Sequence, residues 1–216
     1  TARLLVLASE LGISSVVYAS SLPIIGKPEF LPITEDHPAR PSHFYHLGKW
    51  CGEMACEIFR RSETRVSSLR ITSPYGPGMP PGAVLAQFVR NALIGQKVQW
   101  FGSGTRAQNF VHVFDVVRAA LLASSTSCPG VYNVGGSEAI TMRDLAHLVV
   151  ELTPGTRSTA TAAGLPDVED GWRWDVDLSR AAAGLGYRPT LSLAQGLSEY
   201  IAWERTKADR PGWWVQ

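Results

Sequence analysis

Tyr45 and Lys49 are the residues whose types and spacing most clearly indicate chemistry. They lie four residues apart in a segment with the composition of a helix, and residues at this spacing share one helix face. Because a nearby ammonium favours phenolate over phenol, Tyr45 could take a proton from a substrate hydroxyl while a hydride leaves the same carbon. Ser21, at the end of a predicted strand, could steady that oxygen. The alternative interpretations are a surface tyrosine beside a solvated lysine, and a serine that only binds backbone at a strand end.

The elements around this pair alternate between strands and helices. Short runs rich in β-branched residues, typical of buried strands, occupy 13–20, 65–72 and 130–136. A helix is predicted at 42–61, with Ser42 as its N-cap. A strand, a helix and a strand in succession favour parallel pairing, which brings the carboxyl ends of the strands to one edge. We therefore expect Ser21, Thr72 and Ser73 near that edge, although Thr72 and Ser73 could equally serve only to form a turn.

The rest of the chain is predicted to be mostly helical. Helices are expected at 1–12, 83–95, 114–125, 141–152 and 192–205, with a short Ala-rich turn of helix near 179–185 and a strand at 97–101. Thr141 and Asp144 have the spacing of a helix N-cap and its reciprocal partner. Together with the buried strands, this order predicts a doubly wound α/β sheet with a smaller second lobe.

Composition excludes several classes of function. The 216 residues are 45% hydrophobic and carry a net charge of +1 with acids and bases interspersed, so neither nucleic acid nor an anionic membrane is an expected partner. The three cysteines are too few for a disulfide framework or a zinc site, and no metal is expected. No apolar run approaches the length of a membrane span. We expect a soluble, cytoplasmic protein.

Several longer motifs extend the pattern around Tyr45 over nearly the whole chain. In order they are VVYASS, Tyr45-x-x-x-Lys49 followed by Glu53, LRITSPYGPG, GSGTRAQNFVHVFDV, YNVGG followed by ITMRDLA, and DLSRAAAGLGYRP. In their order and spacing the sequence resembles the extended short-chain dehydrogenases/reductases, in particular the NAD-dependent epimerase/dehydratase family typified by UDP-glucose 4-epimerase.

The resemblance implies an α/β fold with the C-terminal part of a Rossmann-like parallel sheet and a smaller α/β substrate-binding lobe. It assigns 1–75 and 112–136 to a partial NAD(P)-binding domain, 76–111 and 137–205 to the substrate lobe, and 206–216 to a tail. Family members carry a G-x-x-G-x-x-G turn after their first strand, which this sequence lacks. The expectation is that about 100 residues of a typical member, including that turn, precede the position of Thr1.

The resemblance also implies roles for single residues. Tyr45 would be the catalytic acid/base, Lys49 would tune it and bind the nicotinamide ribose, and Ser21 would orient the substrate oxygen. The implied cofactor is NAD or NADP, held by Ser21, Tyr45, Lys49 and Thr72. The implied substrate contacts are Ser73, Leu85 and Arg106, because an arginine can bind phosphate through two donors. An ion pair with an acidic neighbour is the alternative role for Arg106.

Some positions depart from the family pattern. Ser73 and Val84 stand where relatives often have asparagine, and Asp167 stands where some place a phosphate-binding arginine. Leu22 and Pro23 replace the acidic residues of the dehydratases, which favours epimerisation or reduction over elimination.

The expected function is that of an NAD(P)-dependent epimerase or reductase acting on a nucleotide-sugar-type substrate by hydride transfer with tyrosine acid/base catalysis. The alternative is a non-catalytic or truncated family member that cannot bind the dinucleotide by itself. Relatives pair the helices that correspond to 1–12 and 42–61 with their copies in a dimer, so a homodimer is expected. The histidines His43, His46 and His112 have no metal-binding spacing and are expected to be structural.

Overall fold

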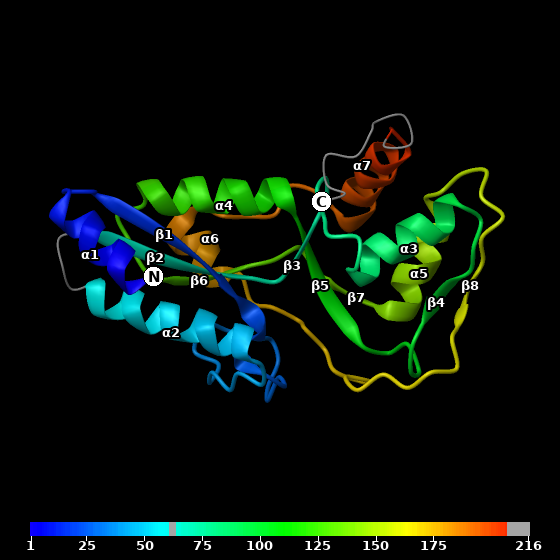
Figure 1. Ribbon diagram of the computed structural model, residues 1–216, viewed down its shortest axis with the longest axis horizontal. Helices are drawn as coiled ribbons and strands as arrows, with labels where there is room; N and C mark the ends of the chain where they lie inside the picture. Colours follow the sequence, from blue (N-terminus) through cyan, green and yellow to red (C-terminus); the bar gives the residue numbers. More distant parts are fainter. Residues whose placement is uncertain (61–63, 207–216) are drawn as a thin grey trace.

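A parallel three-stranded sheet positions the predicted site. The computed structural model describes residues 1–60 and 64–206. The sheet has the order β1-β2-β6, formed by β1 (Ser15–Ser21), β2 (Arg65–Ile71) and β6 (Val131–Val134) (Figure 1). Ser21 pairs with Ile71, which pairs in turn with Val134, so the carboxyl ends of the three strands meet at one edge. The predicted parallel α/β sheet is confirmed.

Helices cover both faces of this sheet. The helices α1 (Ala2–Glu10) and α2 (Phe44–Phe59) lie below it in Figure 1, and α4 (Val113–Ser125) lies above it, with α6 (Ser179–Leu185) beside β6. The short 3-10 helix Leu22–Ile25 follows β1 directly. The prediction that Ser42 caps α2 is wrong, because the N-cap is His43 and no side chain donates or accepts a capping hydrogen bond there.

The other half of the molecule is built around β5 (Ala107–His112). This strand pairs in parallel with β3 (Ser73–Tyr75) and antiparallel with β7 (Ala139–Thr141). The remaining elements here are β4 (Val98–Trp100) paired with β8 (Ala160–Ala162), and the helices α3 (Val84–Leu93), α5 (Met142–Glu151) and α7 (Leu193–Thr206). Thr141 Oγ1 accepts a hydrogen bond from the Asp144 amide at 3.1 Å, which confirms the predicted cap of α5.

The buried hydrophobic residues gather in separate clusters. One lies among α3, α5 and α7 and includes Leu85 and Leu145, and another lies where β2 and β6 meet α4 and includes Leu69 and Val134. The division into a partial Rossmann-like domain and a substrate lobe stays a prediction with which these clusters are compatible. The predicted tail, 206–216, lies outside the described residues apart from Thr206, the last residue of α7.

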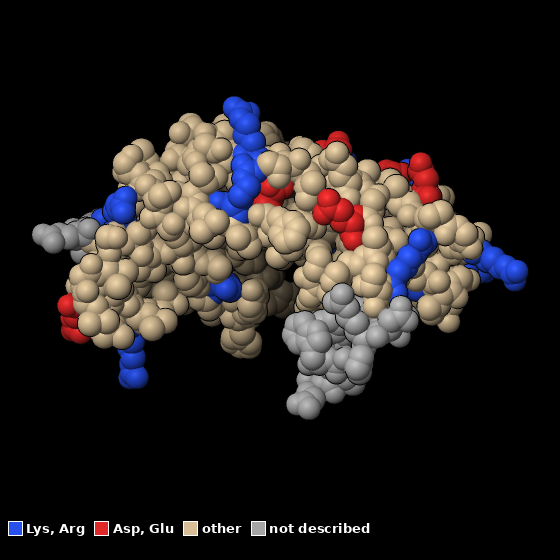
Figure 2. All heavy atoms as spheres, turned by 90° about the horizontal axis from the view of Figure 1, so that it is seen from above, with Lys and Arg blue, Asp and Glu red and all other residues tan. Residues whose placement is uncertain are grey.

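The surface carries scattered charge. On the face that Figure 2 shows, lysine and arginine side chains are interspersed with acidic ones among much larger areas of other residues. In the described part of the chain, no helix has both the length and the apolar character needed to cross a membrane.

Candidate active site

Tyr45 and Lys49 lie on one face of α2, in its first turns, as their spacing predicted. Lys49 Nζ is 5.6 Å from the centre of the Tyr45 ring and donates a hydrogen bond of 2.7 Å to the Ala19 carbonyl of β1. Tyr18, also on β1, donates from its hydroxyl to the Lys49 carbonyl at 3.3 Å. Tyr45 itself is 63% exposed, so a ligand can reach it. The pair is thus attached to the end of β1 that carries Ser21.

Hydroxyl groups lie at the carboxyl ends of the neighbouring strands β1 and β2. Ser21 is half-buried at the end of β1, and Thr72 is buried just after β2. Neither Thr72 Oγ1 nor the buried Ser20 Oγ has a hydrogen-bond partner among the described residues. Because buried hydroxyls are nearly always paired, these two are available to polar atoms of a ligand.

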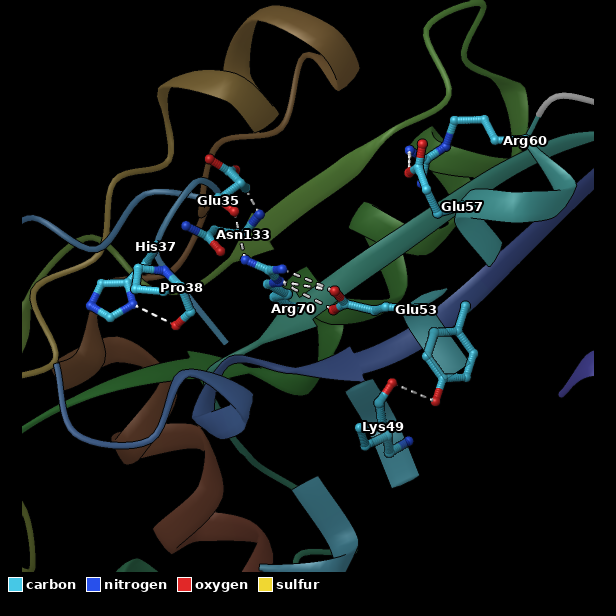
Figure 3. Close-up of polar contacts among 10 residues, drawn as sticks. Glu35, His37, Pro38, Lys49, Glu53, Glu57, Arg60, Arg70 and Asn133 are labelled. Carbon is cyan, nitrogen blue, oxygen red and sulfur yellow. Dashed lines mark hydrogen bonds and ion pairs between the residues drawn. The ribbon is translucent and has the colours of Figure 1, made fainter. Parts of the chain in front are cut away.

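A buried ion pair fixes the helix that carries the tyrosine. Glu53, one turn beyond Lys49, accepts hydrogen bonds from Arg70 of β2 with lengths of 3.0 to 3.2 Å, and both side chains are at most 5% exposed (Figure 3). Arg70 Nη1 also donates to the Glu35 carbonyl at 2.7 Å. Since Tyr45, Lys49 and Glu53 follow one another at intervals of four residues, this ion pair sets the face that α2 turns towards β1.

The network continues from Glu35 to β6. Glu35 Oε1 accepts a hydrogen bond of 2.8 Å from the Asn133 amide, and burial raises the pKa of Glu35 (Figure 3). Asn133 Nδ2 donates to the carbonyls of Ile33 and Asp177 at 3.0 and 3.2 Å. The loop after β1 is therefore held against β2 and β6. Sequence reasoning missed this network, although Glu53 was part of a motif.

A cavity of about 280 Å³ lies next to the start of α2. Ser73 Oγ lies in its wall and accepts a hydrogen bond of 2.5 Å from Gln108. Trp174 lines it too, and its buried indole N–H has no hydrogen-bond partner among the described residues. The lining residues are Pro23, Gly26, Ser42, His43, His46, Ser73, Val84, Arg106, Gln108, Phe110, Glu169, Trp172 and Trp174.

A second cavity, of about 420 Å³, adjoins the first through two shared lining residues, Val84 and Arg106. Aromatic and amide side chains dominate the rest of its wall, which consists of Gly82, Gln87, Phe88, Asn91, Gln99, Trp100, Phe101 and Met142. Leu85, a predicted substrate contact, lines neither cavity, because its side chain is fully buried in the core below α3. Any contact of Leu85 with a ligand would have to use its backbone.

Arg106 stands at the junction of the two cavities and is already paired there. Its Nε lies 2.9 Å from Asp167 Oδ2, and its Nη1 donates to Glu169 Oε2 at 3.0 Å. The Arg106 side chain is 22% exposed. Both interpretations of this residue thus have support, since Arg106 forms ion pairs and also faces the space where a ligand would lie.

His46 links α2 to the first cavity. It lines that cavity, and the centre of its ring lies 5.5 Å from that of Tyr45. Burial, and then the charge of His43, lower the pKa of His46, so it is neutral at pH 7. In the described part of the chain no group of three or more potential ligands could hold a metal ion. The sequence signal for His46 was its place next to Tyr45, which was interpreted as structural only.

The site therefore has two parts. Ser21, Tyr45, Lys49 and Thr72 lie along the sheet edge and the start of α2, whereas Ser73 and Arg106 line the cavities. Trp174, Gln108 and Glu169 also belong to the cavities and were not predicted.

Comparison with known proteins identifies relatives over nearly the whole chain. A dTDP-glucose 4,6-dehydratase of Streptomyces griseus is 29% identical over 222 residues, which cover 99% of this chain and 65% of the relative. A UDP-glucose 4-epimerase of Mycolicibacterium smegmatis is 30% identical and is matched over 68% of its length. A second dTDP-glucose 4,6-dehydratase, of Streptomyces antibioticus, is matched over 60% of its length, so the chain spans somewhat less than two thirds of these dehydratases.

Solved structures give the same result. The UDP-glucose 4-epimerase of Thermotoga maritima with UDP-glucose superposes with a TM-score of 0.86 at 29% identity, over 95% of this chain and 68% of that one. MoeE5 in complex with UDP-glucose and NAD superposes with a TM-score of 0.82 at 30% identity, over 96% of this chain and 70% of that one. The family model described as the NAD dependent epimerase/dehydratase family matches residues 1–135. The chain belongs to the NAD-dependent epimerase/dehydratase family.

Proposed function

We propose that this chain provides the catalytic and substrate-binding parts of an NAD(P)-dependent epimerase or reductase that acts on a nucleotide-sugar-type substrate. The observation that carries the proposal is the position of Lys49 Nζ, 5.6 Å from the centre of the Tyr45 ring and anchored to the Ala19 carbonyl. The hydrogen bond to β1 fixes this ammonium beside the Tyr45 side chain. Tyr45 then removes the proton of a substrate hydroxyl, and Ser21 holds the oxygen by a hydrogen bond.

The residues at the sheet edge fit the nicotinamide end of NAD or NADP. The hydroxyl groups of Ser20 and Thr72 have no hydrogen-bond partner among the described residues, and they lie at the carboxyl ends of two adjacent strands, where α/β sheets bind ligands. Lys49, Tyr45, Ser21 and Thr72 would hold this end of the cofactor. When bound, NAD(P) supplies the hydride acceptor, while the chain moves the proton through Tyr45.

The two cavities support a substrate with a sugar in one and a further group in the other. The first cavity, with Ser73, Gln108 and the indole N–H of Trp174, offers polar contacts to hydroxyl groups. The second, with Phe88, Trp100 and Phe101 in its wall, suits a flat aromatic base. MoeE5, which is 30% identical to this chain, was solved in complex with UDP-glucose and NAD.

Epimerisation or reduction is favoured over elimination. Leu22 and Pro23, the residues directly after Ser21, carry no acidic group, and Leu22 is fully buried. No carboxylate is thus offered there to take part in the loss of water. The alternative function, a family member that cannot bind the dinucleotide by itself, is favoured by β1, which has a strand partner on one side only among the described strands.

Two measurements test the proposal. Titration of the chain with NADH, followed by fluorescence, should show binding at millimolar cofactor or below, and its absence would favour the alternative. In the native protein, Tyr45→Phe should abolish turnover of UDP-sugars and leave binding nearly unchanged. Tyr18→Phe is the matched control, because Lys49 Nζ is also 5.6 Å from the Tyr18 ring, yet the Tyr18 hydroxyl donates to the Lys49 carbonyl of the helix backbone. Equal turnover in both variants would end the assignment.

A homodimer through α1 and α2 is proposed as well. The two helices contact each other on the same side of the sheet (Figure 1). Both expose large apolar side chains to solvent. These are Leu4, Leu7 and Leu11 on or next to α1, and Phe44, Leu47 and Ile58 on α2. A second copy of the same surface would bury them. A monomeric mass for the native protein by light scattering would contradict this proposal.

A further inference from the structure

Two buried nitrogen atoms of residues that line the first cavity have no hydrogen-bond partner among the described residues. They are the indole Nε1 of Trp174 and the Nδ1 of His46. Ser73 and Arg106, in the same wall, already form hydrogen bonds. Buried polar groups are nearly always bonded to protein, to ordered water or to a ligand. A ligand in the first cavity is therefore the partner that we consider for these two nitrogen atoms.

The Trp174 indole is held in place from two sides. It is 5% exposed, and its backbone amide donates to the Ala107 carbonyl of β5 at 3.0 Å. On the other side, the Ile33 amide donates to the Asp175 carbonyl, next to Trp174 in the chain, at 2.7 Å. The ring packs in a hydrophobic cluster with apolar residues that follow Ser21 along the chain, namely Leu22, Ile24, Ile25 and Ile33. The N–H thus has a fixed place relative to the end of β1.

His46 lies on α2 directly after Tyr45, and the centres of the two rings are 5.5 Å apart. Because burial lowers the pKa of His46, its imidazole is neutral at pH 7, with one nitrogen that donates and one that accepts. The indole N–H of Trp174 only donates. A hydroxyl group suits both side chains, since it donates one hydrogen bond and accepts others.

We propose that Trp174 and His46 are specificity-determining residues that bind hydroxyl groups of the sugar, so that the site accepts a fully hydroxylated sugar and disfavours a deoxy sugar. The inference rests on the proposed function and deepens it at the first cavity. A deoxy position places a C–H group against a buried nitrogen, which is then cut off from water without a hydrogen bond. Each such loss corresponds to about tenfold weaker binding.

Calorimetric titration of the native protein tests this inference. The ligands are UDP-glucose, its analogues that each lack one sugar hydroxyl, and UDP as the sugar-free reference. At least one deoxy analogue should bind the wild type about tenfold more weakly than UDP-glucose. Because UDP carries no sugar, its affinity should not depend on Trp174 or His46.

Two substitutions assign the discrimination to its residues. Trp174→Phe removes the N–H, and His46→Phe keeps an aromatic ring and removes both ring nitrogen atoms. Each variant should bind UDP-glucose about tenfold more weakly and should no longer distinguish it from the analogue that lacks the matching hydroxyl. Affinity for UDP should change less than about threefold in both, which also shows that the variants are folded.

Trp172→Phe is the matched control. Trp172 lines the same cavity, but it is only half-buried, and its N–H is not among the buried groups that lack a partner in the described part of the chain. Its replacement should leave the difference between UDP-glucose and the deoxy analogues unchanged. The analogue series on the wild type needs no substitution, so it decides the question even where Trp174→Phe does not fold.

The inference is overturned if every deoxy analogue binds the wild type as tightly as UDP-glucose does, or if the discrimination survives in both Trp174→Phe and His46→Phe. If UDP-glucose binds the wild type no more tightly than UDP, the assignment of the first cavity to the sugar fails, and the inference fails with it. Because binding and not turnover is measured, the outcome does not depend on whether Tyr45 is catalytic.

Discussion

Glu53→Gln should destabilise the chain strongly, because it removes the counter-charge of a buried arginine. Glu53 and Arg70 are 1% and 5% exposed, and three of their atom pairs lie between 3.0 and 3.2 Å. Loss of one partner from a buried ion pair typically costs about 3–5 kcal/mol, since the other charge is left without compensation. Glutamine keeps one acceptor oxygen, so we expect about 3 kcal/mol. For a chain of this size that is a fall of about 6–12 °C in melting temperature.

The same helix provides the control. Glu57, one turn beyond Glu53, pairs with Arg60 but is 51% exposed, and Glu57→Gln should cost less than about 1 kcal/mol. Urea unfolding followed by the fluorescence of the seven tryptophans would measure both variants. Equal losses of unfolding free energy for Glu53→Gln and Glu57→Gln would refute the reasoning from burial.

A double-mutant cycle separates the ion pair from its surroundings. Glu53→Met/Arg70→Met should lose less stability than the sum of the single substitutions, because it leaves no uncompensated charge in the core. Some loss should remain, since the Glu35 carbonyl would lack the donor that Arg70 Nη1 now provides at 2.7 Å. Additive single losses would show that the two side chains act independently.

Three further predictions concern the helix cap, the core and pH. Thr141→Ala should cost about 1 kcal/mol in urea unfolding, because the Asp144 amide loses its acceptor; a loss below about 0.3 kcal/mol would count against the cap. Leu85→Ala, at a fully buried position, should lower the free energy of unfolding by about 2–5 kcal/mol. Val84→Ala, at 37% exposure, should lower it by less than about 1 kcal/mol and alter ligand affinity instead. A larger loss of stability for Val84→Ala than for Leu85→Ala would contradict the assigned positions. Burial lowers the pKa of His46 below its ordinary 6.5, so as the pH falls the unfolded chain takes up this proton before the folded chain does. The contribution of the neutral His46 to the free energy of unfolding is therefore complete above pH 6.5 and falls as the pH drops below it. His46→Gln should therefore show a smaller fall in melting temperature than the wild type between about pH 7.5 and pH 5.5, and an identical fall would exclude a role for His46.

The sequence was sufficient for elements whose signal is local. The buried strands were predicted at 13–20, 65–72 and 130–136 and observed at Ser15–Ser21, Arg65–Ile71 and Val131–Val134. The α5 cap could be predicted because the bonds are local: the Thr141 hydroxyl accepts from the Asp144 amide three residues on and donates to the Asp144 carboxylate, without help from distant residues. The strands β3, β7 and β8 have three residues each, too few to show a period, and pairing with distant segments defines them.

In the candidate site too, local features could be predicted from the sequence, whereas contacts between distant segments could not. The shared face of Tyr45 and Lys49 follows from helical spacing, but their attachment to β1 depends on the Ala19 carbonyl, 30 residues away in sequence. The two roles considered for Arg106 could not be separated from sequence, because Asp167 and Glu169 lie about 60 residues further along the chain. Ser42 was a reasonable cap by residue type, yet the helix begins one position later.

Glu53 shows why spacing alone underdetermines a site. Positions 45, 49 and 53 share one stripe of α2, and the sequence gives no reason to treat the third differently from the first two. In the structure Tyr45 is 63% exposed, whereas the Glu53 carboxylate at the other end of the stripe is buried and paired with Arg70. The buried ion pair of Glu53 fixes α2, so Tyr45 can be exposed to a ligand while the helix keeps its orientation relative to β1. If that is correct, Glu53→Gln should reduce turnover in the native protein even at temperatures where it remains folded, whereas Glu57→Gln should not.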